Sequence, residues 1–286
     1  MNPAPSYLKS NIGTEWSRAR SCLILAKNDF IMDIATITST RVQAPDLPGH
    51  RLGSQMSNHF HDGLALNHNW RVSPEAGTNH VPPLLKCKRQ LNIGTFNART
   101  LNQAHSFGEF ALDAKNKGMD IISIQEHRIL HEETTRFWDI SKDYTLITTS
   151  ATKNSRNASM GGVGILCHNK YIHSIISTQK ISSRILRIDF EGNPATSIFT
   201  CYSPTNTSEE DEAAEFYNTL SDAVEDVLAH NFLLLSGDFN AKLGPEDCKF
   251  TYNSHTNRNG NFLLDLMEDH MLFATNTLFQ KPFSRL

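Results

Sequence analysis

The chain lacks any long apolar run. It has 286 residues, and none of its apolar runs approaches the roughly 20 residues that a membrane-spanning helix needs. The run at residues 22–26 is too short for the core of a signal peptide and lies too far from the N-terminus. The five cysteines are scattered and include no CxxC pair, which indicates free thiols in a reducing compartment and not a disulfide framework or zinc site. We therefore expect an intracellular protein, nuclear or cytoplasmic, with no transmembrane segment.

The chain also lacks a strong excess of positive charge. Its formal net charge is −3. The part before about residue 90 is net positive, so the excess of acidic residues lies in the part that follows. An acidic domain is not what a simple nucleic-acid binder needs. It is compatible with a metal-dependent enzyme, whose carboxylates surround a cation. Charge alone does not decide the substrate.

Residues 1–87 lack sustained hydrophobic periodicity and are rich in Pro, Ser, Asn and His. This composition predicts a low-order leader, mostly loop or disorder, with a short strand or helix possible between Asp29 and Thr40. His59 and His61 could ligate a metal, but histidines in a polar stretch are more often solvated. The domain boundaries that we expect are a leader at 1–87 and one folded domain at 88–286.

The stretch from Leu233 to Ala241 is the most informative part of the sequence. An apolar run of strand length ends in Gly237, Asp238, Phe239 and Asn240, which predicts a buried strand that delivers side chains to a site at its carboxyl end. In an extended segment Asp238 and Asn240 point the same way and Phe239 points oppositely, into a core. Gly237 would allow a ligand close to the backbone. An Asp-Asn turn that merely closes a strand explains the same residues equally well.

Three further predicted strands end in polar residues. The strand at 91–96 ends at Asn97, the strand at 119–125 at Glu126, and the strand at 195–202 at Tyr202. Each has an ordinary explanation: a turn, a solvated strand end, or a tyrosine with its hydroxyl outward. Additional strands are predicted at 144–149, 163–166, 172–176, 185–190 and 272–277, and helices at 107–118, 207–228 and 262–267. Residues Thr207, Ser208, Glu209 and Glu210 have the character of a capping box at a helix start.

In order along the chain, these motifs resemble the endonuclease/exonuclease/phosphatase superfamily, which has the DNase I-like fold. They are Phe96-Asn97, Gln125-Glu126, Tyr202-Ser203-Pro204 and Gly237-Asp238-Phe239-Asn240. A Gly-Gly-Val-Gly strand at 161–164 also matches; a P-loop reading of it is poor, because no Lys-Ser/Thr follows. The sequence is most similar to endonuclease domains of non-LTR retrotransposons and to craniofacial development protein 2-like proteins. The resemblance implies an α/β fold: a four-layer αββα sandwich of two packed mixed sheets.

The resemblance also implies phosphodiester hydrolysis that depends on Mg²⁺, with Mn²⁺ possible. Glu126 would hold the metal with help from Asn97, and Asp238 would orient or deprotonate the attacking water. Asn240 would contact the phosphate, and Tyr202 would support the transition state. DNA is the implied partner, and the folded domain is expected to be a monomer.

One part of the superfamily pattern is missing. No closing Asp-His strand or Trp-x-Ser-Pro segment follows in the sequence, so we expect a sandwich that lacks its last strand or strands and has weak or no activity as it stands. The alternative function is a non-catalytic relic or nucleic-acid-binding module with the same fold. A phosphoinositide substrate is disfavoured, because Ala241 and Lys242 follow Asn240 where inositol phosphatases carry Tyr-Arg.

Overall fold

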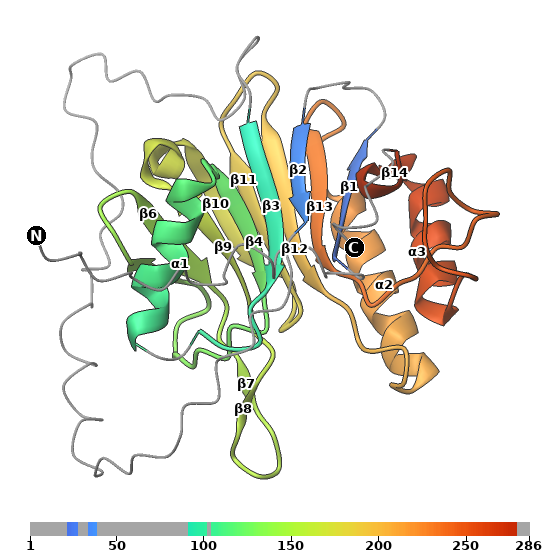
Figure 1. The fold of residues 1–286 in the computed structure, drawn as a ribbon, viewed down its shortest axis with the longest axis horizontal. Coiled ribbons are helices and arrows are strands. Elements are labelled where there is room, and N and C mark those ends of the chain that lie inside the picture. The colour runs from blue at the N-terminus through green and yellow to red at the C-terminus, as the bar shows by residue number, and fades with distance from the viewer. Residues whose placement is uncertain (1–21, 28–33, 39–90, 102–103, 279–286) are drawn as a thin grey trace, which may run out of the picture.

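The protein is a layered α/β sandwich. The computed structural model describes residues 22–27, 34–38, 91–101 and 104–278. Figure 1 shows two sheets side by side, with α1 (Ala104–Asn116) on one outer face and α2 (Glu210–Glu225) and α3 (Arg258–Asp269) on the other. The predicted four-layer αββα arrangement is confirmed.

Both sheets are mixed, as the sequence predicted. Sheet A has the order β10 (Ile175–Lys180), β11 (Ile185–Phe190), β12 (Thr196–Tyr202), β13 (Phe232–Asp238), β1 (Cys22–Lys27) and β14 (Leu272–Ala274). Sheet B has the order β2 (Ile34–Thr38), β3 (Leu91–Asn97), β4 (Ile121–Gln125), β9 (Val163–His168), β6 (Tyr144–Thr148) and β5 (Arg136–Asp139). The pairs β12–β13, β2–β3 and β3–β4 are parallel and the others antiparallel.

A short hairpin projects from the sandwich. It consists of β7 (Thr152–Lys153) and β8 (Ser159–Met160), and it extends below the ends of β3 and β4 in Figure 1. Its base is tied to the segment that follows β4, because the Arg128 N–H donates to the Gly161 carbonyl at 3.0 Å and the Ala151 N–H to the Ile129 carbonyl at 2.8 Å. Neither this hairpin nor β5 was predicted from the sequence.

Three apolar clusters hold the layers together. Leu234, Ile198, Ile188 and other residues fill the space between the two sheets. Phe110 and Ala114 of α1 pack on the outer face of sheet B, and residues of α2 and α3 pack on the outer face of sheet A. Fully burying one such side chain contributes roughly 1.5–3 kcal/mol, so these clusters are the main source of stability.

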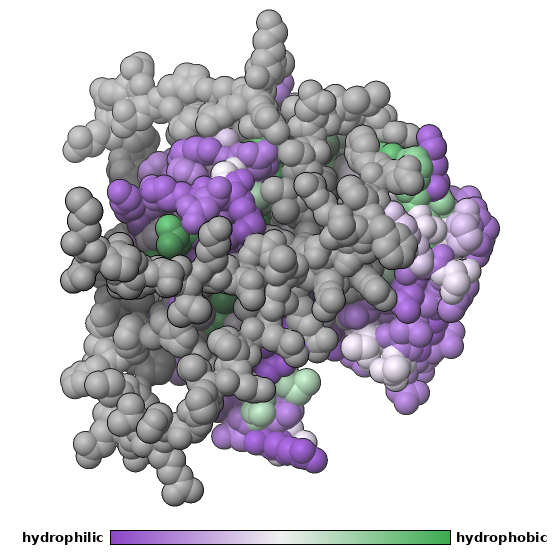
Figure 2. Space-filling model, in the orientation of Figure 1, coloured by the Kyte–Doolittle hydropathy of each residue, from purple (hydrophilic) through white to green (hydrophobic). Residues whose placement is uncertain are grey.

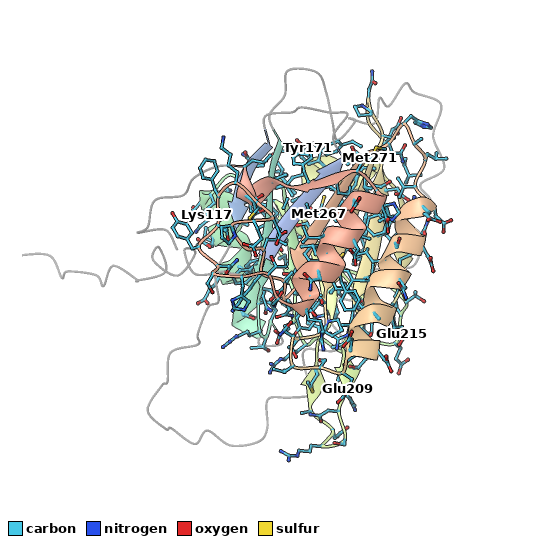
Figure 3. All side chains as sticks on the ribbon, turned by 90° about the vertical axis from the view of Figure 1, so that its right-hand side faces the viewer. Lys117, Tyr171, Glu209, Glu215, Met267 and Met271 are labelled. Atoms are coloured by element: carbon cyan, nitrogen blue, oxygen red, sulfur yellow. The ribbon has the colours of Figure 1, made fainter. Side chains whose placement is uncertain are left out.

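The helices follow their apolar periodicity. In α2 the buried positions are Ala213, Phe216, Tyr217, Leu220, Ala223 and Val224, at the spacing that places them on one face. Figure 3 shows the opposite side of α2, where Glu215 faces solvent, and Met267 on α3. The surface over α2 and α3 is mainly hydrophilic in Figure 2. No helix among the described residues is long and apolar enough to span a bilayer.

Some local predictions need correction. The capping box at Glu209 does not form, since this N-cap residue makes no side-chain cap hydrogen bond; the hydroxyls of Thr205, Thr207 and Ser208 contact one another instead. Residues Asn169–Ser174 form a 3₁₀ helix, so the strand predicted at 172–176 begins only at Ile175. After Ala274 the last predicted strand gives way to a 3₁₀ turn, Thr275–Thr277.

Gly237 serves packing between strands. A Cβ at this position would lie 2.0 Å from the carbonyl oxygen of Cys201 on the parallel neighbour β12. The close approach is therefore made by the adjacent backbone, and the ligand approach that we expected at Gly237 is wrong.

Two strands come from the segment expected to be a leader. β1 lies between β13 and β14 in sheet A, and β2 pairs with β3 in sheet B. The short element expected between Asp29 and Thr40 is thus the strand β2, and the sheets begin before residue 88. The remainder of 1–87, including His59 and His61, lies outside the described residues, so its low order stays a prediction.

Because β1 pairs on both sides, its backbone amides are needed by the sheet. We expect Leu25→Pro to lower the free energy of unfolding by about 3 kcal/mol, because proline removes a ladder donor from a central strand. The measurement is urea denaturation of the full chain. Ile176→Pro is the matched control, since exposed Ile176 sits at a register shift in the edge strand β10. Equal destabilisation by the two substitutions would show that β1 is not a central strand.

Candidate active site

Four strands bring their polar ends to one edge of the sandwich. β3 and β4 are parallel neighbours in sheet B, and Asn97 at the end of β3 is opposite Gln125 at the end of β4. β12 and β13 are parallel neighbours in sheet A, with Tyr202 opposite Asp238. Parallel strands put their carboxyl ends at the same edge, so the motifs that are far apart in the sequence become adjacent.

The Asn97 side chain links the two sheets. Its Nδ2 donates to Glu126 Oε1 at 2.8 Å and to Asp238 Oδ2 at 2.9 Å. Its Oδ1 accepts from the Arg99 N–H at 3.2 Å. Both N–H groups of the amide are thereby used, one on each carboxylate. Two acidic side chains from different sheets are held around a single nitrogen.

Glu126 occupies an unusual backbone conformation. It follows the last residue of β4 with a φ of 54°, in the left-handed region that non-glycine residues rarely adopt. Tyr202 crosses from sheet A and donates its hydroxyl to Glu126 Oε1 at 2.9 Å. Burial, followed by the charge of Glu126, raises the pKa of Tyr202, so the phenol keeps its proton and remains a donor. Backbone strain of this kind costs on the order of 1–3 kcal/mol and is often found at functional sites.

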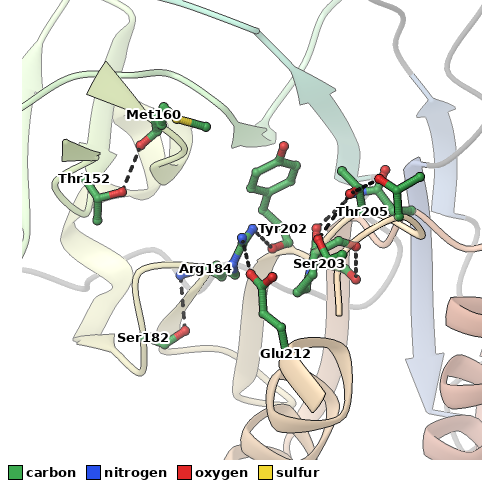
Figure 4. Close-up of polar contacts among 12 residues, drawn as sticks. Thr152, Met160, Ser182, Arg184, Tyr202, Ser203, Thr205 and Glu212 are labelled. Carbon is green, nitrogen blue, oxygen red and sulfur yellow. Dashed lines mark hydrogen bonds and ion pairs between the residues drawn. The ribbon is translucent and has the colours of Figure 1, made fainter. Parts of the chain in front are cut away.

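Arg184 supports Tyr202 from the side away from the carboxylates. Figure 4 shows Tyr202 projecting toward the strand ends of the opposite sheet while Arg184 bonds to its backbone. Arg184 Nη1 donates to the Tyr202 carbonyl at 3.4 Å, and its Nη2 donates to Glu212 Oε1 at 2.8 Å. The guanidinium lies 5.4 Å from the centre of the tyrosine ring. This contact fixes the end of β12 where the phenol leaves the strand.

Asp238 and Asn240 do not point the same way, contrary to our expectation. β13 ends at Asp238, and Asn240 has a φ of 48°, so the alternation of an extended chain stops there. The Asn240 N–H donates to Asp238 Oδ1 at 3.0 Å, and its side-chain amide donates to the Ser203 carbonyl at 2.9 Å. Phe239 is fully buried in the core beneath α2 and α3, as predicted.

A buried asparagine holds the loop next to Tyr202. Asn259 at the start of α3 is fully buried, and its Nδ2 donates to the Pro204 carbonyl at 2.8 Å and to Ser203 Oγ at 3.3 Å. The loop after β12 is thereby tied to α3.

His127 lies behind Glu126 and was not recognised from the sequence. Its ring is fully buried and contacts the Val163 carbonyl at 3.3 Å through Nε2, while Nδ1 accepts from the Ile129 N–H at 3.0 Å. A Cβ at Gly162 would lie 2.5 Å from this ring, which explains the glycine. Burial lowers the pKa of His127 to about 4, so the imidazole is neutral and fixes the turn after Glu126.

The donor set fits a magnesium ion in its chemistry. Glu126 and Asp238 offer carboxylate oxygens, which hard cations prefer, and Mg²⁺ commonly takes only one or two carboxylates from the protein. The Asn97 amide oxygen, the third possible ligand, accepts from the Arg99 N–H in this structure. Glu126 Oε2 has one cationic neighbour, Arg128 Nη2, at 3.4 Å. No group of three or more His, Cys, Asp or Glu side chains suited to a metal occurs among the described residues. Any ion here would therefore need waters or a substrate oxygen to complete its coordination.

All five residues expected at the site lie at this edge. Asn97, Glu126, Tyr202 and Asp238 form one hydrogen-bonded group, and Asn240 joins it through its backbone. His127 and Arg128 are the additional neighbours, and they are the next two residues after Glu126 in the sequence. Their position beside a predicted site residue is the signal that could have found them.

Comparisons with known proteins give relatives of low identity. The chain is 27% identical over 224 residues to craniofacial development protein 2 of Tragulus javanicus, covering 76% of this chain and 37% of that protein. It is 28% identical over 206 residues to the Bos taurus protein of the same name, covering 70% and 33%. The chain thus spans about a third of the length of these curated relatives. The similarity to such proteins that the motifs indicated is confirmed. No family model matches the chain.

Three solved structures resemble parts of the fold. They are the AP endonuclease LMAP from Leishmania major, with a TM-score of 0.45 and 11% identity, the catalytic domain of Xenopus laevis APE2, with 0.40 and 13%, and D. rerio TDP2 complexed with a single-strand DNA product, with 0.37 and 12%. They cover 61%, 60% and 54% of this chain, and 65%, 66% and 62% of their own chains.

The neutral His127 makes stability depend on pH. Its pKa is lowered from 6.5 to about 4, so below pH 6.5 the unfolded chain binds a proton that the folded chain does not. The contribution of His127 to the free energy of unfolding is fully present above pH 6.5. It decreases by roughly 3 kcal/mol as the pH drops toward 4.

Urea denaturation at pH 7, 5.5 and 4 measures this dependence. We expect the free energy of unfolding to fall more between pH 7 and pH 4 in wild type than in His127→Gln. His255 is exposed, so the control His255→Gln should behave like wild type. The same change in the free energy of unfolding with pH in wild type and His127→Gln would contradict a buried neutral imidazole.

Proposed function

We propose that this chain forms a magnesium-dependent phosphodiesterase domain that acts on DNA, of the endonuclease type that accompanies non-LTR retrotransposons. The observation that carries the proposal is the Asn97 bridge between Glu126 and Asp238. Two carboxylates from different sheets on one neutral amide form an acidic centre suited to a divalent cation. The motif resemblance supports the same function.

Each residue takes the role that the resemblance implies. Glu126 and Asn97 would hold the metal, which would supply charge stabilisation to the phosphate and the leaving oxygen. Asp238, with its carboxylate turned toward the same centre, would orient or deprotonate the attacking water. Tyr202, protonated at neutral pH, would donate to developing negative charge. Asn240 would contact the phosphate from its place beside Asp238.

DNA as the substrate rests on the local motifs. Residues 95–101 resemble retrotransposon endonucleases, and residues 125–128 match the Gln-Glu motif of the superfamily. Arg128 Nη2 lies 3.4 Å from Glu126 Oε2, beside the acidic end of β4. A cationic flank beside a metal-binding centre suits a polyanionic backbone. The alternative, a non-catalytic module that keeps the fold, predicts binding of DNA without hydrolysis.

Metal binding is the first test. Glu126→Gln keeps the shape of the side chain and removes its charge, so we expect Mg²⁺ affinity to fall about tenfold or more by calorimetry, because a hard cation depends on charged oxygen ligands. Glu132→Gln, an exposed carboxylate nearby, should bind like wild type. Equal affinity in wild type and Glu126→Gln would refute the assignment of the ligand.

Hydrolysis is the second test. We expect only weak nicking of supercoiled plasmid by the full chain in Mg²⁺, and Asp238→Asn should lower that rate by a factor of about 10²–10⁴, the range expected when a positioned acid–base group is removed. Asp265→Asn, at an exposed carboxylate of α3, is the matched control. DNA binding by wild type without any nicking would favour the non-catalytic module.

A further inference from the structure

The inner faces of the four site strands are ordered in layers. The pairing register places Asn97 and Gln125 of sheet B and Tyr202 and Asp238 of sheet A at the open edge. Two residues deeper along every strand, the residues are Thr95, Ser123, Thr200 and Ser236. A further two residues along each strand, away from the edge, the residues are Ile93, Ile121, Ile198 and Leu234. We call the middle set the hydroxyl layer, because each of its four members carries one hydroxyl.

The hydroxyl layer is completely buried. All four side chains have 0% exposure. Thr200 donates to Ser123 Oγ at 3.0 Å, which joins sheet A to sheet B, and Thr95 donates to Gln125 Oε1 at 3.2 Å, which joins the layer to the residue before Glu126. Below it, the aliphatic layer belongs to the apolar cluster between the sheets. Between these two layers the interior of the sandwich therefore changes from apolar to polar as the strands approach the site.

This layer is not arranged for maximal stability. Ser236 Oγ and Gln125 Nε2 are buried with no hydrogen-bond partner among the described residues. A buried polar atom without a partner is unfavourable, whereas apolar groups of the same shape would be neutral or stabilising there. Four aliphatic residues would continue the packing of the layer below. The presence of hydroxyls at these four positions is therefore not explained by stability.

Geometry supplies the reason. Serine and threonine are smaller than the isoleucines and leucine one layer deeper, so the two sheets can approach at the edge. The Asn97–Asp238 and Tyr202–Glu126 bonds, both 2.9 Å long, must span the same gap between the sheets. A hydroxyl–hydroxyl bond is directional and fixes the separation of two strands, while aliphatic contacts tolerate sliding.

We propose that the hydroxyl layer is a positioning layer, in which Thr200 and Ser123 set the inter-sheet distance that brings Glu126 and Asp238 to one cation. This rests on the proposed function, since it concerns the same site. None of the four hydroxyls is assigned as a ligand of the cation; they would act through the residues at the edge.

The test removes the inter-sheet hydroxyl bond without changing shape. The full-length double variant Ser123→Ala/Thr200→Val is compared with wild type for melting temperature and for Mg²⁺ affinity, measured by competition with terbium luminescence. We expect Mg²⁺ affinity to fall about 10-fold or more, as for residues that orient metal ligands, with a melting temperature equal to or above that of wild type. Thr200→Ser, which keeps the hydroxyl, should retain wild-type affinity.

Ile198→Val, one layer deeper on the same strand and face, is the matched control. It should lower the melting temperature by a few degrees and leave the affinity unchanged. Wild-type affinity in the double variant overturns the proposal, as does a loss of affinity that Ile198→Val reproduces or that Thr200→Ser does not rescue. A wild-type chain that binds no cation also overturns it. Altered cation affinity in a chain that never nicks DNA upholds the positioning layer and removes the proposed catalysis.

Discussion

The arrangement of the site depends on one amide between two carboxylates. The Asn97 side chain reaches Glu126 in its own sheet and Asp238 in the facing sheet. Hydrogen bonds to charged groups contribute about 1.5–3 kcal/mol each, which is comparable with the cost of about 1–3 kcal/mol for the left-handed backbone at Glu126. The bridge is therefore strong enough to hold a strained residue in place. It also requires both sheets to end at the same level.

That requirement accounts for the glycines near the site. Gly237 lets β13 lie against the Cys201 carbonyl, so that Asp238 emerges level with Tyr202. Gly162 leaves room for the His127 ring, which fixes the turn that carries Glu126. Both glycines serve contacts within the protein. Four non-glycine residues with positive φ, Arg99, Glu126, Arg128 and Asn240, lie beside this edge. Strain is thus concentrated where the strands deliver their side chains.

The sequence predicted most of the architecture because strand and helix periods reflect burial. Apolar runs located β3, β4, β12 and β13, and their polar terminal residues located the site. It could not predict the direction of Asn240 or the conformation of Glu126, because both depend on left-handed backbone that periodicity does not encode. It also missed the roles of β1 and β2, whose partners lie far along the chain. His127 was missed because a histidine next to a carboxylate in the sequence is expected to be solvated. Its burial depends on contact with Gly162, which is distant in the sequence.

The contrast between layers explains how one sandwich combines stability with a polar site. The aliphatic layer of Ile93, Ile121, Ile198 and Leu234 and the outer clusters bury enough apolar surface to stabilise the fold. That surplus allows the neighbouring layers to contain hydroxyls, an amide and two carboxylates, some without partners. Natural proteins depart from optimal packing mainly at functional sites, and two of the departures here, Ser236 Oγ and Gln125 Nε2, lie at this edge of the sandwich. The same edge carries the bonds of Asn97 and Tyr202 between the two sheets, so the polar groups left without partners lie beside the polar groups that join the sheets.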